Sequence, residues 1–267
     1  MSTQHSKLAE DKWEKSILDY LSILFKDQWI PSHDVTHHRR VWQNAKEFIR
    51  SIESKFQKED EYFFEKLIIT SFFHDTGLLR DKSELHGKLS RDICVDFLQQ
   101  YQDKIRFDTS GMLEVIENHD KKNYLDSSDK SFNALFDILS IADDFDAFGA
   151  IGAYRYMEIY LMRNIKLDLI PETILINAAK RHSNFIVVLN KIQVPFPEMN
   201  AKYNELNNLF MAGSYIEDPF SLVEWVNESI VKPRKNPTTY LQNTNKEFII
   251  NERILTFILK YNEEIYG

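Results

Sequence analysis

The sequence predicts an all-α protein, and three observations support this prediction. Apolar residues recur at helical spacing along nearly the whole chain of 267 residues. Glycine and proline number only 7 each, about half of their usual share, so residues that favour turns are scarce. No stretch alternates apolar and polar residues in the way that a half-buried strand does. We therefore expect a bundle of long helices.

The first two predicted helices are separated by a proline break. The apolar stripe from Trp13 to Leu24 predicts one helix, and the stripe from Val41 to Ile52 predicts the next. Pro31 and Ser32 interrupt the helical pattern between them, and Asp34 is placed to cap the second helix.

Three more helices are expected before residue 120. One runs from about Glu61 to Phe73, with Gly77 as its C-cap. The next spans Ser83 to Tyr101, with Ser83 as its N-cap, and a shorter apolar pattern covers residues 111–118.

The rest of the chain continues the helical pattern. A polar segment, 121–130, precedes a strongly apolar helix expected over residues 132–148, and the small residues 149–153 lead into another helix, 154–163. Pro171 is a good helix start. Two or three further helices follow, separated by prolines. Their aromatic residues, together with His182, are expected to serve packing, with lid or dimer contacts as the one further role.

Charge and composition exclude several classes of protein. The net charge of −8 and the pI of about 5.5 argue against a broad nucleic-acid-binding face. The single cysteine, Cys94, rules out an internal disulfide framework and suits a reducing compartment. No apolar run approaches the roughly 18 residues of a membrane span, and the N-terminus lacks a signal-peptide pattern. We expect a soluble cytoplasmic protein.

Polar residues that can bind metal lie on the apolar faces of three predicted helices. His37 shares the face of Val41, the pair His74 and Asp75 ends the next predicted helix, and Asp143 lies on the helix of residues 132–148. Burying such groups without partners is costly, and one shared divalent cation would satisfy them together. Two imidazoles and two carboxylates suit Mn²⁺, Fe²⁺, Co²⁺, Zn²⁺ or Mg²⁺. On the opposing interpretation, His74 and Asp75 merely end a helix.

The order and flanks of these residues resemble the H…HD…D signature of HD-domain metal-dependent phosphohydrolases. The matching segments are HDVTHHRRV at residues 33–41, FFHDTGL at 72–78 and IADDFDAFG at 141–149. The resemblance makes His37 the first ligand rather than His33 or His38, and Asp143 the last rather than Asp144. It covers about residues 18–163. It therefore implies an HD-domain helical bundle over residues 1–165, with a C-terminal helical extension, residues 166–267, packed on or beside it.

Further residues are candidates for a role at such a site. Some HD proteins carry extra histidines for a second metal or for the scissile phosphate, and His86 and His119 are placed for that role, although a core histidine bonded to a carbonyl is common. The acidic residues Asp81, Glu84 and Asp146 are candidates for a catalytic or supporting role, although acidic residues in loops are more often simply solvated. Asp34 is either a helix cap or a neighbour of the site. The candidate phosphate-binding cations are Arg40, Lys88, Arg91, Lys121, Lys122 and Arg155.

The resemblance implies a hydrolase in which metal-activated water attacks phosphorus. The expected substrate is a small phosphorylated metabolite, with a nucleotide as the favoured class, and a monoester, diester or pyrophosphate bond is left open. One alternative is a non-catalytic ligand-sensing or scaffold protein on the same fold, since the C-terminal region resembles no catalytic module and could form a homodimer surface. Another is a cyclic-nucleotide phosphodiesterase, whose extended histidine set is not clearly reproduced.

Overall fold

The computed structural model describes residues 2–53, 60–83, 85–120 and 133–266, and within these ranges it contains helices and no strand. The all-α fold class is therefore confirmed. The elements are α1 (Ser2–Leu24), η1 (Pro31–His33), α2 (Val35–Ser51), α3 (Phe63–Phe73), η2 (Thr76–Leu79), α4 (His86–Gln100), η3 (Gln102–Lys104), α5 (Ser110–Asn118), α6 (Ala134–Asp146), α7 (Gly149–Met162), η4 (Leu167–Leu169), α8 (Ile170–Ile192), α9 (Pro197–Phe210), α10 (Pro219–Val226), η5 (Asn227–Val231), α11 (Pro237–Asn243), η6 (Lys246–Phe248) and α12 (Glu252–Tyr266). No helix among the described residues is both long and apolar enough to cross a membrane.

The chain divides by packing into two compact units. Unit 1 comprises Met1–Asp143 and Asn184–Pro195, and unit 2 comprises Asp144–Ser183 and Phe196–Gly267. The sequence predicts two domains, residues 1–165 and 166–267, and this division stays a prediction.

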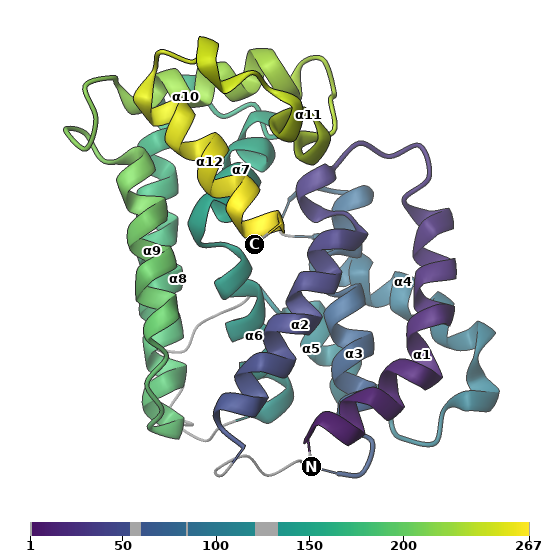
Figure 1. Cartoon of the computed structure of the whole chain (residues 1–267). Coiled ribbons are helices and arrows are strands. Elements are labelled where there is room, and N and C mark those ends of the chain that lie inside the picture. Colours follow the sequence, from purple (N-terminus) through teal and green to yellow (C-terminus); the bar gives the residue numbers. More distant parts are fainter. Residues whose placement is uncertain (1, 54–59, 84, 121–132, 267) are drawn as a thin grey trace. The chain divides into compact units, whose positions relative to one another are not determined.

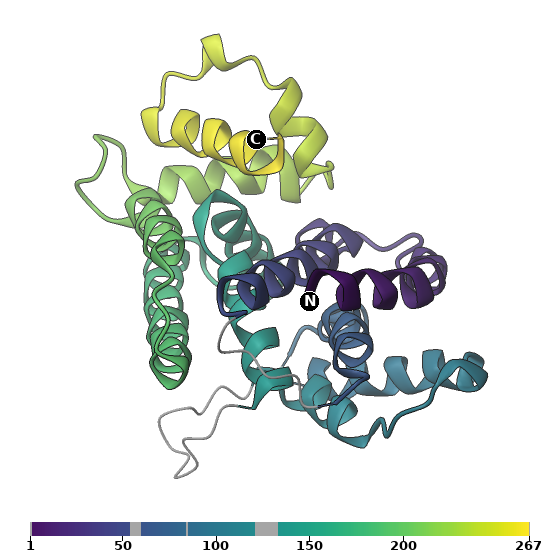
Figure 2. The same ribbon diagram turned by 60° about the horizontal axis from the view of Figure 1, so that its bottom comes forward.

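Unit 1 is built on α1, α2 and α3, which lie side by side, with α4 and α5 packed on one another and on α3 (Figure 1). The same grouping of purple to blue helices is visible after rotation (Figure 2). Its core is aromatic: Trp13 of α1, Trp42 of α2, Phe73 of α3 and Phe97 of α4 are fully or almost fully buried. Phe73 and Phe97 pack with ring centroids 4.8 Å apart. Burial of such large apolar faces is the main force that assembles these helices.

Unit 2 has α7 at its centre, since α7 contacts both α9 and α12. The small residues at the start of α7 let other backbone approach closely: a Cβ at Gly152 would lie 2.2 Å from the carbonyl oxygen of Ala147. Gly149 has a φ of +71°, which favours glycine, and it begins the helix directly after Phe148. The segment 149–153 thus belongs to α7 rather than preceding it.

Two of the predicted helix caps are wrong. The third helix ends with His74 as its C-cap, and Gly77 lies beyond it in η2. Gly77 is needed for close packing instead, because a Cβ there would lie 2.0 Å from the backbone oxygen of His86. The fourth helix begins at His86 with Leu85 at the N-cap position. Ser83 lies two residues earlier, where its hydroxyl accepts a hydrogen bond from the Leu85 amide at 3.2 Å.

Candidate metal centre

Four helices and one short turn of unit 1 bring histidines and aspartates together. His37 lies in the first turn of α2, whose N-cap Asp34 accepts a hydrogen bond from the Thr36 amide at 2.8 Å. His74 and Asp75 link α3 to η2, and Asp143 lies in α6. The remaining two, His86 and His119, are the first residue of α4 and the C-cap of α5. All six side chains are buried.

One group of possible ligands comprises His37, His74, Asp75 and Asp143, whose ligand atoms all lie within 4.8 Å of one another. The Nε2 atoms of His37 and His74 are 3.3 Å apart. Asp75 Oδ2 lies 3.5 Å from His37 Nε2 and 3.4 Å from His74 Nε2. Asp143 Oδ1 lies 4.0 Å and 3.8 Å from the same two nitrogens. This mixed nitrogen and oxygen set could hold a divalent cation.

A second group comprises Asp75, His86 and His119. The Nε2 atoms of the two histidines are 3.3 Å apart. Asp75 Oδ1 lies 2.9 Å from His119 Nε2 and 3.5 Å from His86 Nε2. Asp75 therefore presents one carboxylate oxygen to each group, which is the arrangement of a carboxylate that bridges two ions.

Three of these imidazoles are oriented by hydrogen bonds on the side away from Asp75. Each Nδ1 lies next to the backbone carbonyl three residues earlier in the chain: His74 next to Ser71 at 3.0 Å, His86 next to Ser83 at 2.7 Å and His119 next to Ile116 at 2.8 Å. A carbonyl can only accept, so Nδ1 carries the proton and donates it. In the neutral ring this leaves the Nε2 lone pair directed into the cluster, as a metal ligand requires.

The electrostatics of the cluster favour positive charge. Burial lowers the pKa of His74, but the Asp75 and Asp143 carboxylates outweigh burial and raise that pKa to about 9. Burial likewise lowers the pKa of His86, and the Asp120 and Asp75 carboxylates raise it to about 11. For Asp75, burial raises the pKa, but the surrounding imidazoles, His74 first, hold it well below its usual range. The carboxylates thus create a negative potential that binds protons or cations.

Three residues near the cluster are not among the predicted site residues, and the resemblance favours His37 over two of them, His33 and His38. His38 is fully buried and forms a third possible ligand group with His37 and His74. Burial, followed by His37 and His74, holds the pKa of His38 well below its usual range, so the ring is neutral. His33 Nε2 lies 4.0 Å from Asp75 Oδ2, and Asp120 Oδ2 lies 3.0 Å from His86 Nε2. His38 and Asp120 directly follow His37 and His119 in the chain, and His33 lies four residues before His37. These positions are the signals in the sequence that could have identified them.

The other candidate residues have varied surroundings. Arg40 is half-buried and donates to the Thr36 hydroxyl at 3.3 Å, while Arg91 lies 3.5 Å from Glu117. Lys88 is exposed. Asp81 is half-buried, and its carboxylate accepts from the Ser83 amide at 2.6 Å.

Asp146 and Arg155, in unit 2, are both buried and paired at 3.2 Å. Glu84, Lys121 and Lys122 lie outside the described residues.

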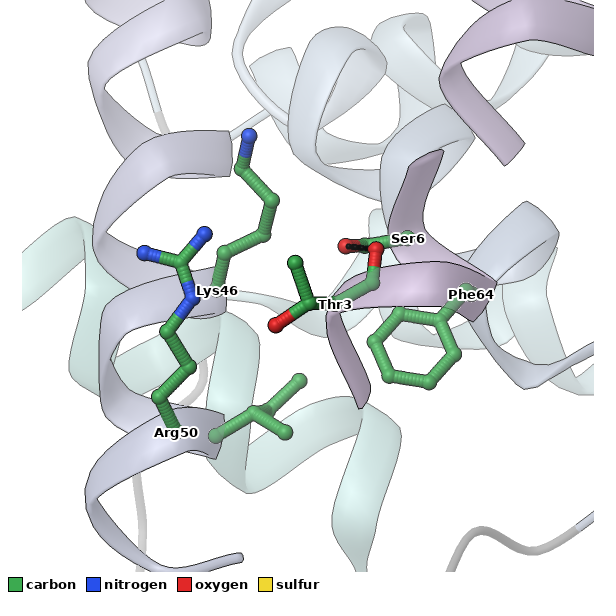
Figure 3. Close-up of a pocket in the computed structure, with 6 residues that line it drawn as sticks. Thr3, Ser6, Lys46, Arg50 and Phe64 are labelled. Carbon is green, nitrogen blue, oxygen red and sulfur yellow. Dashed lines mark hydrogen bonds between the residues drawn. The ribbon is translucent and has the colours of Figure 1, made fainter. Parts of the chain in front are cut away.

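A pocket elsewhere in unit 1 is not part of this centre. It lies between the start of α1 and the helices α2 and α3, and its lining residues are Thr3, Ser6, Lys46, Ile49, Arg50 and Phe64 (Figure 3). None of them belongs to the ligand groups. Lys46 donates to Glu10 at 2.5 Å, so its charge is already compensated.

The donor set fits a divalent cation. Its imidazole lone pairs converge on shared carboxylates inside the protein, and Nδ1 contacts with carbonyls hold three of the rings. Scans against models of known families, curated proteins and solved structures each find no match.

Proposed function

We propose that this protein is a metal-dependent phosphohydrolase of the HD type, with a centre for two divalent ions. In this proposal His37, His74, Asp75 and Asp143 hold one ion, and Asp75, His86 and His119 hold the other. The proposed substrate is a small phosphorylated metabolite, with a nucleotide as the favoured class.

The observation that carries the proposal is the position of Asp75. Its Oδ2 faces the Nε2 atoms of His37 and His74, and its Oδ1 faces those of His86 and His119. Hydrolytic two-ion centres place their ions about 3.5–4 Å apart, a distance that one bridging carboxylate can span. An ordinary buried ion pair needs one partner for the carboxylate and does not require four converging imidazoles.

The chemistry of such a centre divides between the ions and the chain. Bound divalent ions would lower the pKa of a water and polarise the phosphoryl oxygen. The chain itself orients the imidazoles through the Nδ1 contacts and excludes bulk water from the buried ligands. Asp120, whose side chain is 46% exposed, contacts His86 and is placed to exchange a proton with solvent at its carboxylate oxygen.

A cationic residue beside a proposed ligand supports an anionic substrate. Arg40 lies one turn after His37 in α2, on the same side of that helix, whereas Lys88 lies two residues after His86 in α4 and so on a different side. We propose that Arg40 contacts phosphate oxygens. The preference for a nucleotide rests on the resemblance to HD-domain phosphohydrolases.

The testing experiment combines metal content with turnover. Protein stripped with a chelator is reloaded with Mn²⁺, Fe²⁺, Co²⁺, Zn²⁺ or Mg²⁺, its metal is measured by elemental analysis, and phosphate or pyrophosphate release is followed with nucleoside mono-, di- and triphosphates and with cyclic nucleotides. We expect two ions per chain and selective release. Asp75→Asn should lose both ions, whereas His119→Gln should lose only the ion in the second group.

Asp137→Asn is the matched control, because Asp137 is a buried carboxylate on the same helix as Asp143 but pairs with Lys191 instead. It should retain both ions. Failure to load any ion after reconstitution would overturn the proposal. Bound ions without release from any of these substrates would replace it with the ligand-sensing or scaffold function.

A further inference from the structure

His38 is a buried polar side chain whose hydrogen-bonding capacity is unmet. It is 0% exposed, and neither Nδ1 nor Nε2 has a hydrogen-bond partner among the residues that the structure describes. A neutral imidazole has one donor and one acceptor, and leaving both unpaired in the core carries a large free-energy penalty. The adjacent Val41 and Trp42 show that apolar side chains fill this part of α2 readily. A polar ring there therefore needs a physical reason.

The rings around His38 do not supply that reason. Phe25 lies edge-on at a centroid distance of 5.7 Å, and His74 lies at 5.4 Å with an interplanar angle of 81°. An aromatic face can accept a weak N–H contact, but it cannot donate to a lone pair. His37, with its ring centroid 5.1 Å away, directs its Nε2 toward His74 Nε2 at 3.3 Å.

A cation is the one partner that would satisfy three lone pairs together. His37, His38 and His74 each offer a nitrogen within 4.8 Å of the other two. At the usual distance of about 2.1 Å from metal to imidazole nitrogen, two ligand nitrogens lie roughly 3.0–4.2 Å apart for angles at the metal of about 90° to 180°. The three side chains thus need only a small adjustment to reach one ion.

We propose that His38 is a further ligand of the ion held by His37 and His74, so that this position offers three imidazoles. The inference rests on the proposed metal centre and adds a determinant of which metal it takes. Imidazole favours Zn²⁺, Fe²⁺, Co²⁺ and Ni²⁺, whereas Mg²⁺ and Mn²⁺ favour oxygen ligands and water. His38 therefore makes this position selective for Zn²⁺, Fe²⁺, Co²⁺ or Ni²⁺ over Mg²⁺ and Mn²⁺.

The test uses the Co²⁺-loaded full chain and reads its visible absorption spectrum, which depends on the number and type of ligands. His38→Phe keeps a ring of similar size but removes both nitrogens. We expect its spectrum to change, and the ratio of Co²⁺ to Mn²⁺ affinity to fall at least about tenfold, the order of loss seen when support for a metal site is removed. In His38→Ala, added imidazole should restore the wild-type spectrum by occupying the vacated space.

Val41→Ala is the matched control, since it removes buried volume one turn along α2 without removing a nitrogen. Its Co²⁺ spectrum should equal that of the wild type. An unchanged spectrum and affinity ratio in His38→Phe, or His38→Ala that imidazole does not restore, would overturn the role of His38 and leave the two-ion proposal intact. A wild-type chain that binds no Co²⁺ would overturn the metal centre itself.

Discussion

At the scale of single residues, the most unusual feature of the chain is the burial of most of its histidines. Six of its eight histidines are buried, although histidine is usually only intermediate in burial. All six belong to the ligand groups or, for His33, lie next to them. Their burial in unit 1 is difficult to explain by packing alone, because each imidazole brings two polar nitrogens into the core.

Packing alone does explain the burial of Cys94, in contrast to the histidines, because its side chain behaves as a small apolar group in the core. It is fully buried, and burial raises the pKa of its thiol well above the usual range. The thiolate is the reactive form, so the raised pKa suppresses reaction. We expect Cys94 to stay unreactive toward a thiol reagent at about pH 8 in the native protein and to react once in urea. Rapid stoichiometric labelling without denaturant would contradict this.

At the scale of elements, the contact between η2 and the start of α4 sets the position of His86. Gly77 donates its amide to the Ser90 hydroxyl at 2.8 Å, and its missing side chain lets the His86 backbone approach. The position of His86 in α4 relative to Asp75 beside η2, two of the three residues of the second ligand group, therefore depends on Gly77.

Gly77→Ala should accordingly lower the free energy of unfolding by about 2–4 kcal/mol, because its Cβ would overlap backbone that cannot move aside. It should also weaken binding of the second ion, as measured by titration with metal. Gly111→Ala is the comparison, since a Cβ there meets no atom within 4 Å. That variant should gain up to about 0.5–1 kcal/mol from helix propensity. Similar urea midpoints for the two variants would refute the packing explanation.

A buried ion pair joins α6 to the end of α8 within unit 1. Lys191 Nζ lies 3.3 Å from both carboxylate oxygens of Asp137, which is 1% exposed. Burial raises the pKa of Asp137, and Lys191 lowers it in part. The ionised carboxylate is thus tolerated in the core because of its partner.

Lys191→Met should lower stability by about 2–3 kcal/mol near pH 7, because it leaves a buried carboxylate without its counter-charge. In this variant the pKa of Asp137 rises further above its value in the unfolded chain. The loss should therefore shrink as the pH falls through that raised pKa, since the carboxyl group takes up a proton. Urea unfolding at neutral and mildly acidic pH measures the difference. An equal loss at both pH values would show that the lost lysine packing, not charge, is responsible.

At the scale of the whole molecule, the proposed ligands all lie in one of the two compact units. The ligand groups fall within Met1–Asp143 of unit 1, and unit 2 contains none of them. Any stabilisation by metal should therefore appear first in unit 1.

Removing metal with a chelator should lower protection from hydrogen exchange in α2 to α6 more than in α9 to α12. Metal at 100 times its dissociation constant stabilises the form that binds it by about 2.7 kcal/mol. Hydrogen-exchange mass spectrometry with and without chelator measures the effect by segment. Equal changes in both sets of helices would show that the stabilisation is not local to unit 1.

Sequence alone was sufficient for the helical fold and for the inward polar residues, because both depend on local spacing. The stripe from Val41 to Ile52 predicts α2 since residues three and four apart share a helix face. Helix ends were less predictable. Gly77 and Ser83 are typical cap residues, but the packing of η2 against α4 determines where those helices stop and start.

Only the tertiary structure decided which polar residues meet. The spacing of His86 and His119 places each on an apolar face, but it does not show that both approach Asp75 Oδ1 while His37 and His74 approach Oδ2. It likewise does not show that His38 lacks a hydrogen-bond partner among the described residues. The contact between His119 and Asp75 joins residues 44 apart in the chain, and such geometry arises only when the helices pack to close-packed density.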